Sequence, residues 1–451
     1  MSIPGLGQIP AEPLESATRT VSLRPAGEWR FQVAPGSSVT LKVLSGTAEK
    51  DGVELALRHA YKLSGIKSKI LTWHGCELEV DGRCEAEAVA EFPQPTANPA
   101  TSYVNLHARL LEMRAAAAAQ RREGPRVLVA GPPGCGKTTL ARTLASYATR
   151  QGHQPIVVNA DPSEGMLSLA GTLSASVFAT VMDPEAVDGW GSTPTSGPST
   201  VPVKLPLVYY YGRESAEEDA DVYREVMGKL AGAVSGRLSE DADVKSAGVI
   251  VDTMGVNDGS PRGVDLLAHI VDELSVNIVV TLGSTPVCKQ IAERFANEKT
   301  SLGEAIQVVA LDQSDGVVDR SDDFLQHTRE AAVKEYFFGD ARRTLSPQIQ
   351  QVDFGSLVIY RLPDYSDYES ETLIREEVSS PMEHWALAVM HASVKDSPET
   401  IRAAGVMGFV YVSDVDEQKR KAKVLAPVSG RLGDRPLVWG RWPEPFINLL
   451  G

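Results

Sequence analysis

The sequence predicts an α/β protein in which a central parallel sheet is flanked by an N-terminal β-sandwich and a small C-terminal α+β domain. Three observations predict this fold class. Short alternating runs extend from about residue 21 to residue 92 in a first range, 1–100. Strands alternate with helix-length stretches from residue 126 in a second range, 101–340, and strand-like runs surround one helical stretch in a third, 341–451. Since 451 residues are too many for one ordinary core, we expect these three ranges to be three domains.

The composition is that of a soluble globular protein. Apolar residues make up 43% of the chain and charged residues 23%, which excludes disorder of the whole chain. No apolar run approaches the roughly 18 residues of a membrane span, and the first residues lack the pattern of a secretory signal. The formal charge of −15 argues against a broad basic surface for nucleic acid. Four cysteines without a CxxC pattern suit a reducing compartment.

The first hundred residues predict antiparallel strands. Apolar and polar residues alternate in 28–33 and 39–44, and glycines separate the runs, which is typical of a small sandwich or barrel. The proline-rich stretch 93–99 predicts a linker. A helix is expected next, capped by Thr101 or Ser102 and extending through the alanines to residue 119.

From residue 126 onward, strands alternate with helix-length stretches, which predicts a parallel sheet with helices on both faces. The predicted strands are Arg126–Ala130, Pro155–Asn159, Ala247–Asp252, Asn277–Leu282 and Ile306–Leu311.

Two further segments complete the organisation along the chain. A Ser/Thr/Pro/Gly-rich segment at 189–206 predicts a surface insertion. In the last domain we expect strands at 357–362, 406–412 and 422–425, and a helix near 383–394.

One motif predicts nucleotide binding. Residues 131–138 read GPPGCGKT, a complete GxxxxGK[ST] loop that follows an apolar strand and opens a helix over 139–147. The Lys side chain of such a loop bridges the β- and γ-phosphates of ATP, and the Thr hydroxyl holds Mg²⁺. The residues expected to contact ATP through this loop are Gly134, Cys135, Gly136, Lys137, Thr138 and Thr139. Because Cys135 lies at a helix N-terminus, we expect its thiolate form to be favoured.

A carboxylate is also needed near the phosphates, and two candidates remain open. Asp161 ends the strand after the loop, where it would order Mg²⁺ together with Thr138 or act as a base on an acceptor hydroxyl. Asp252 ends a later strand and is the rival. Both would lie at the carboxyl ends of parallel strands, where ligands bind in open α/β sheets.

Further short runs surround this loop in a characteristic order. They are Trp73-His74-Gly75-Cys76, Gly124-Pro125-Arg126-Val127, Pro206-Leu207-Val208-Tyr209, Gly316-Val317-Val318-Asp319-Arg320-Ser321 and Glu335-Tyr336-Phe337-Phe338-Gly339. With them the chain resembles, over nearly its whole length, the Clp family of subunits of the eukaryotic, fungal-type mRNA cleavage and polyadenylation factor IA. That family is a branch of the polynucleotide 5′-hydroxyl kinases.

The resemblance implies bound ATP and Mg²⁺, a place in the nucleus, and a role in mRNA 3′-end cleavage and polyadenylation. It implies assembly with a scaffold subunit that contacts the RNA polymerase II C-terminal domain and with other cleavage and polyadenylation subunits, with RNA touched weakly or indirectly. It also implies that Glu28 and Lys67 contact the adenine base, although in the absence of the resemblance both would be taken for solvent-facing strand charges.

The chain departs from the pattern of the active kinases in this family. Active members carry Gln three positions after the catalytic Asp, where this chain has Glu164, and a substrate-packing Trp where it has Val256. Of two arginines that meet the phosphates, Arg320 is kept and the second is Leu325, while a Lys is replaced by Gln313.

We therefore expect an ATP-binding structural subunit whose kinase activity is lost, with Asp161 as a vestigial base. The alternative is an active ATP-dependent polyribonucleotide 5′-hydroxyl kinase that uses Asp161 and Arg320. A more distant alternative is a P-loop ATPase that performs mechanical work.

Overall fold

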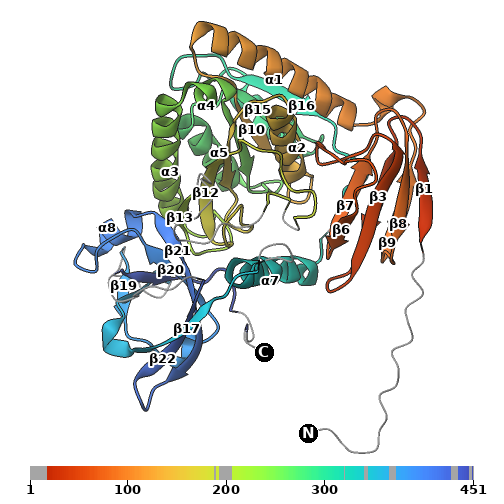
Figure 1. The fold of residues 1–451 in the computed structure, drawn as a ribbon. Helices are drawn as coiled ribbons and strands as arrows, with labels where there is room; N and C mark the ends of the chain where they lie inside the picture. The colour runs from red at the N-terminus through yellow and green to blue at the C-terminus, as the bar shows by residue number, and fades with distance from the viewer. Residues whose placement is uncertain are drawn as a thin grey trace, which may run out of the picture. The chain divides into compact units, whose positions relative to one another are not determined.

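The computed structural model describes residues 18–186, 189–191, 206–318, 320–339, 344–364, 372–427, 435–445 and 449. The chain divides into two compact units, which are described separately. The first contains residues up to 50 together with 54–98, and the second contains 51–53 and residues from 99 onward (Figure 1). Most of the predicted insertion, residues 192–205, lies outside the described residues.

The first unit is the predicted β-sandwich, with one sheet in the order β1-β8-β3-β6 and the other in the order β5-β4-β7-β2-β9. Its elements are β1 (Arg19–Leu23), β2 (Glu28–Gln32), β3 (Ser38–Gly46), β4 (Glu49–Lys50), β5 (Val53–Glu54), β6 (Tyr61–Ser64), β7 (Lys67–Leu71), β8 (Cys76–Asp81), β9 (Ala86–Ala90) and the 3₁₀ turn η1 (Pro95–Ala97). Trp29 and Phe31 alternate with polar neighbours on β2 and stack at 4.2 Å inside the sandwich core.

The second unit contains a seven-stranded sheet in the order β13-β12-β11-β14-β10-β15-β16. Its strands are β10 (Arg126–Ala130), β11 (Ile156–Ala160), β12 (Thr172–Val177), β13 (Leu207–Tyr210), β14 (Val249–Thr253), β15 (Ile278–Leu282) and β16 (Gln307–Leu311). The five strands predicted from sequence are confirmed within two residues, and they are the parallel ones. β12 and β13 pair antiparallel at one edge, so the sheet is mixed rather than wholly parallel.

Helices cover both faces of this sheet (Figure 1). The helices of this part are α1 (Ala100–Gln120), α2 (Lys137–Arg150), α3 (Ala220–Glu240), α4 (Ala242–Ala247), α5 (Pro261–Glu273) and α6 (Pro286–Phe295). A further helix, α7 (Asp322–Phe338), follows β16 and packs its buried residues with the second sheet. The predicted cap of the first helix is wrong, because Pro99 occupies the cap position without a side-chain bond. Ser102 lies inside the helix, and its hydroxyl donates to the carbonyl oxygen of Pro99 at 2.7 Å.

The same unit contains a second seven-stranded sheet in the order β17-β22-β21-β20-β23-β18-β19. Its elements are β17 (Gln348–Asp353), β18 (Ile359–Arg361), β19 (Ile374–Glu376), β20 (Ala386–Met390), β21 (Val406–Asp416), β22 (Lys421–Ala426), β23 (Leu437–Trp439), the helix α8 (Pro398–Ala403), and the 3₁₀ turns η2 (Phe354–Ser356) and η3 (Ser380–Met382). The helix predicted near 383–394 is wrong, because β20 occupies that stretch. Four of the five β20 residues are buried, and a short apolar run without a polar face does not distinguish a helix from a strand.

The two sheets of the second unit share a core. Tyr210 of β13 packs with Tyr336 and Phe337 of α7 and with Phe409 of β21. The Phe409 N–H also donates to the Tyr336 hydroxyl at 2.8 Å. Residues 99–451 therefore form one compact unit, and the predicted domain boundary at 340 stays a prediction.

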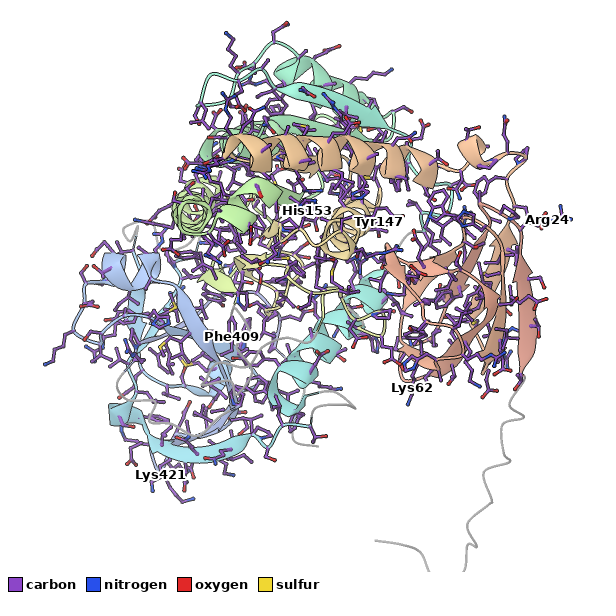
Figure 2. All side chains as sticks on the ribbon, turned by 45° about the horizontal axis from the view of Figure 1, so that its top comes forward. Arg24, Lys62, Tyr147, His153, Phe409 and Lys421 are labelled. Carbon is purple, nitrogen blue, oxygen red and sulfur yellow. The ribbon has the colours of Figure 1, made fainter. Side chains whose placement is uncertain are left out.

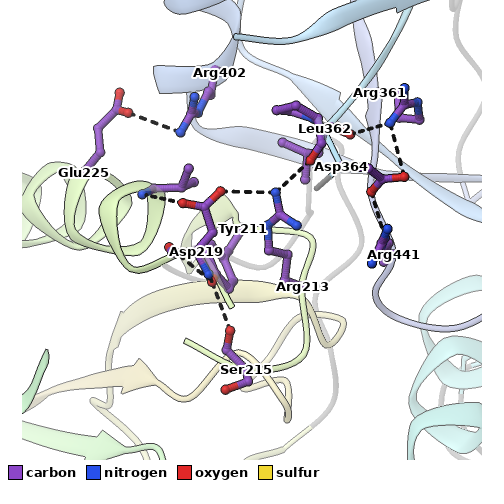
Figure 3. A network of polar contacts seen from close by, with 12 residues as sticks. Tyr211, Arg213, Ser215, Asp219, Glu225, Arg361, Leu362, Asp364, Arg402 and Arg441 are labelled. Atoms are coloured by element: carbon purple, nitrogen blue, oxygen red, sulfur yellow. Dashed lines mark hydrogen bonds and ion pairs between the residues drawn. The ribbon is translucent and has the colours of Figure 1, made fainter. Parts of the chain in front are cut away.

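Polar contacts join the same two sheets (Figure 3). The Arg213 guanidinium donates to Asp219 at 3.1 Å and to the carbonyl oxygen of Pro363 at 2.8 Å. Arg402 of α8 lies 3.6 Å from Glu225 of α3. Because Arg213 is buried, its contacts fix the segment that follows β18 against the start of α3. None of the helices in the described ranges is long and apolar enough to cross a membrane.

Basic side chains gather where α1 packs on α2. The His107 ring of α1 lies 5.1 Å from the ring of Tyr147, and Tyr147 and His153 are labelled in Figure 2. Arg114 is fully buried, and its Nε donates to the carbonyl oxygen of Ala247 at 2.9 Å. Burial, together with the positive charges of Arg114, His153 and Arg150, lowers the pKa of His107 to about 4.

This low pKa predicts a loss of stability in acid. Between pH 6.5 and 4, His107 is protonated in the unfolded chain and not in the folded chain, so a falling pH favours unfolding. When the pH falls from 7.5 to 5, we expect His107→Gln to lose about 1 kcal/mol less free energy of unfolding than the parent protein. This is half of the value that the difference in pKa between the folded and unfolded chains gives by itself, because the ring is partly exposed to solvent. Urea unfolding at the two pH values measures this, with His391→Gln at an exposed site as the control. Equal acid sensitivity of His107→Gln and the parent would contradict it.

Candidate nucleotide site

The GxxxxGK[ST] loop joins β10 to α2, as predicted. Gly134 has φ +70° and Gly136 has φ +98°, conformations that favour glycine over any residue with a Cβ. A Cβ placed at Gly134 would meet nothing within 4 Å, so this part of the loop backbone faces open space. Backbone N–H groups exposed at the start of a helix are suited to phosphate oxygens.

Three adjacent strands bring the predicted polar groups to one edge of the sheet. β14 lies between β10 and β11, and its Asp252 is paired in register with Val129 and Asn159. The loop follows β10, Asp161 follows β11, and Asp252 is next to last in β14. Since all three strands are parallel, their carboxyl ends meet at the same crevice.

Lys137 lies over the loop and faces both carboxylates. Its side chain is buried, and its Nζ donates to the carbonyl oxygen of Pro132 at 2.9 Å. Burial raises the pKa of Asp161 and of Asp252, and the positive charge of Lys137 offsets part of that rise at each. The ammonium group therefore lies within electrostatic range of both acids that the sequence left as rivals.

Asp252 is the carboxylate that interacts with Thr138. It is 3% exposed, and burial raises its pKa to about 7, although a hydrogen bond with the Thr138 hydroxyl lowers it. Its Oδ1 is buried and has no hydrogen-bond partner within the described part of the chain. A hydroxyl beside a carboxylate with an unused oxygen fits a Mg²⁺ ligand set that phosphate and water complete. No group of three or more His, Cys, Asp or Glu side chains within the described ranges could hold a metal by itself.

Asp161 is held by its own loop. Its Oδ1 accepts from the Ser163 N–H at 2.9 Å and from the Ser163 hydroxyl at 2.6 Å. Burial raises the pKa of Asp161, and the negative charge of Glu164 raises it further. Asn159 holds the same loop by donating to the carbonyl oxygens of Asp161 and Glu164. A carboxyl with a raised pKa that lies beside the crevice is suited to accept a proton.

Arg320 and Glu164 form an ion pair at the site. Both side chains are about one third exposed, and Arg320 Nη2 donates to Glu164 Oε1. Burial disfavours the charged guanidinium, but the negative charge of Glu164 and this hydrogen bond outweigh it and raise the pKa of Arg320. Asp161 and Asp252 act on Arg320 in the same direction, so Arg320 faces the carboxylates that surround the loop.

The C-terminal end of the described chain also contacts this loop, which the sequence did not reveal. The Trp442 Nε1 lies 3.4 Å from the carbonyl oxygen of Ser163, and the indole lies under the Arg329 guanidinium at 4.4 Å. Arg329 makes a bidentate ion pair with Glu444. The N–H of Trp442 also donates to the carbonyl oxygen of Gly212 at 3.1 Å. Through these contacts α7 is joined to the Asp161 loop at a second place besides Arg320.

Three further positions depart from the pattern of the active kinases, and the structure describes each of them. Val256 is fully buried in the core, and its N–H donates to the carbonyl oxygen of Gly131 at 3.1 Å. A side chain at this position points into the protein and offers no surface for a substrate base. Leu325 lies in the first turns of α7 and supplies no charge. Gln313 is exposed near Gly283.

The expectation for Cys135 is corrected by the structure. Its thiol is 2% exposed, and burial raises its pKa more than the loop and Lys137 lower it. A Cβ at Gly131 would approach the Cys135 sulfur to 2.9 Å, so the thiol packs behind the loop. The helix N-terminus does not make this thiol reactive, because burial disfavours the charged thiolate more strongly than the helix dipole stabilises it.

Glu28 and Lys67 lie in the first unit, on adjacent strands. The antiparallel register pairs Glu28 with Leu71 and Lys67 with Gln32, so the two residues lie at opposite ends of the strand pair, roughly 13 Å apart. Glu28 is fully buried, and Lys69 reaches it at 2.5 Å. The adenine contacts of Glu28 and Lys67 stay predictions.

Comparisons with known proteins agree with this arrangement along the whole chain. Residues 22–117 match the N-terminal beta-sandwich domain of polyadenylation factor, 131–339 match the mRNA cleavage and polyadenylation factor CLP1 P-loop, and 345–444 match the pre-mRNA cleavage complex II protein Clp1. The chain is 54% identical to the mRNA cleavage and polyadenylation factor CLP1 of Pyricularia oryzae and 48% identical to that of Chaetomium globosum, in each case over 100% of both chains.

Two solved structures are similar over most of their length. The wild-type Clp1p–Pcf11p complex matches with a TM-score of 0.84 and 27% identity over 95% of this chain and 98% of that one. A second structure matches with a TM-score of 0.83 and 26% identity, over 95% and 99%. It describes an extended interface between Pcf11p and Clp1p and the structural basis for ATP loss in a glycine-to-arginine mutant.

Proposed function

Because the chain belongs to the Clp1 family of mRNA cleavage and polyadenylation factors, we propose that it is a nuclear, ATP-binding structural subunit of the complex that cleaves and polyadenylates pre-mRNA. The observation that carries the proposal is the intact loop 131–138 with Lys137 buried above it and Thr138 paired with Asp252. A complete phosphate site of this kind supports tight binding of a nucleoside triphosphate.

Each residue of the site has a defined task in this proposal. The backbone N–H groups of 134–139 bind phosphate oxygens, and Lys137 bridges the β- and γ-phosphates. Thr138 and Asp252 would hold Mg²⁺, with Asp161 nearby to order its water, and the ion would supply neutralisation of charge on the phosphates. Glu28 and Lys67 contact the adenine base.

We propose that phosphoryl transfer is lost. Transfer requires an acceptor hydroxyl positioned in line with the γ-phosphate and cations that stabilise the migrating charge. Val256 is buried, Leu325 is uncharged, and Arg320 is paired with Glu164. Asp161 is the observation in favour of the alternative, an active polyribonucleotide 5′-hydroxyl kinase, because its raised pKa suits a general base.

The partner we propose is a scaffold subunit of the cleavage factor. The similar solved structures are of Clp1p bound to Pcf11p, and they cover 95% of this chain. The proposed scaffold binds the RNA polymerase II C-terminal domain, and it brings this subunit to the transcript together with other cleavage and polyadenylation subunits. Contact with RNA is then indirect or weak, as the charge of −15 also suggests.

We expect the purified protein to carry ATP rather than ADP. An intact phosphate site without a working transfer set binds the triphosphate and leaves it uncleaved. The test is to denature the protein as isolated and separate the released nucleotide by ion exchange. Mostly ADP would favour a working ATPase or kinase, and the absence of nucleotide would contradict the proposed function.

A further inference from the structure

The crevice beside the loop holds more negative than positive side chains. Three carboxylates, Asp161, Glu164 and Asp252, interact there with two cations, Lys137 and Arg320. Glu164 makes the ion pair with Arg320 and at the same time raises the pKa of both aspartates. An anionic ligand that enters this crevice must therefore compete with Glu164 for a cation.

Glu164 is positioned for this competition by its backbone. Asn159 donates to the carbonyl oxygen of Glu164 at 2.9 Å, and Trp442 contacts the carbonyl oxygen of Ser163 next to it. The Glu164 carboxylate thus extends from a fixed loop. Arg320 lies just before α7, whose first turn is capped by the Ser321 hydroxyl. The side chain of Arg320, about one third exposed, is free to exchange one anionic partner for another while α7 stays in place.

Resting on the proposed binding of ATP, we propose that Glu164 competes with the terminal phosphate of the nucleotide for Arg320 and so sets the preference of the site for triphosphate over diphosphate. A phosphate with two negative charges and three oxygens is a stronger guanidinium partner than one carboxylate. ATP supplies that phosphate and draws Arg320 away from Glu164, at the cost of one ion pair. ADP lacks it and leaves the pair intact.

The proposal predicts distinct effects for the two members of the pair. Glu164→Gln keeps the size of the side chain and removes the competitor, so ATP binds about fivefold more tightly while ADP changes little. Arg320→Ala removes the cation, so ATP binds about fivefold more weakly and the ratio of ATP to ADP affinity falls. In the double variant the gain from Glu164→Gln disappears, because no arginine is left to release.

The experiment is calorimetric titration of the full chain, stripped of nucleotide, with Mg-ATP and with Mg-ADP. Asp323→Asn is the matched control, because it removes one carboxylate from the first turn of α7. We expect its ratio of ATP to ADP affinity to equal that of the parent. If Glu164→Gln tightens both nucleotides equally, or keeps its gain in the Arg320→Ala background, a general charge effect overturns the proposal. No binding of either nucleotide by the parent would overturn the proposed function as well.

Discussion

Replacing Lys137 and Thr138 together by alanine is expected to abolish ATP binding and the stability that ATP gives to the folded protein. Lys137 is the buried cation above the loop, and Thr138 is the hydroxyl beside Asp252. Without them the phosphates lose their bridging charge and Mg²⁺ loses a ligand, so we expect affinity to fall at least about 100-fold. A ligand present at 100 times its dissociation constant stabilises the native state by about 2.7 kcal/mol, and a 100-fold loss of affinity leaves about 0.4 kcal/mol of this in the variant.

Thermal unfolding with and without Mg-ATP measures the loss. Lys289→Ala, at an exposed position of α6, is the control and should keep the full ATP-dependent shift. Far-ultraviolet circular dichroism at low temperature checks that the double variant is folded. An ATP-dependent shift of the parent size in the double variant would show that the nucleotide binds elsewhere.

The second large effect is the absence of phosphoryl transfer. A transition-state arginine is worth roughly 10³–10⁵ in rate, and an aromatic platform adds about 1–3 kcal/mol of base stacking. This chain has Leu325 and the buried Val256 at the positions that would supply them, and its remaining Arg320 is held by Glu164. With several parts missing at once, we expect no transfer above background even with ATP saturating.

The assay follows labelled γ-phosphate into an RNA oligonucleotide that carries a 5′-hydroxyl, with an active polynucleotide kinase as the positive control. Background labelling is the expected result. Strong labelling that Lys137→Ala removes would establish the alternative, an active 5′-hydroxyl kinase. Val256→Trp is not a route to recovery, because Val256 is fully buried and its Cγ1 would already lie 2.8 Å from a Cβ at Gly263.

Local patterns account for what the sequence predicted well. The five parallel strands are continuous apolar runs, and the loop 131–138 is a contiguous motif. β12 was missed because only Leu173 and Val177 in Thr172–Val177 are large apolar residues, although the fold buries the strand. β20 was taken for a helix because its apolar run lacks the alternation of a half-exposed strand.

From the sequence, only those parts of the site could be predicted that are formed by residues close together along the chain. The choice between Asp161 and Asp252 depends on β14 lying between β10 and β11, which no local pattern encodes. The Glu164–Arg320 pair joins residues 156 positions apart, and Trp442 meets Ser163 across 279 positions. These contacts arise from strand order and from the packing of the second sheet, so they become visible only in the folded chain.

The contact between Trp442 and Ser163 has a consequence for the order of synthesis. A ribosome makes the loop 131–138 and the Asp161 loop first, and the indole that contacts the Asp161 loop and Arg329 of α7 follows 279 positions after Ser163. The Asp161 loop therefore gains this support only after residue 442 has been synthesised. A nascent or truncated chain that ends before residue 440 contains the whole phosphate-binding motif and still lacks the indole that contacts the Asp161 loop.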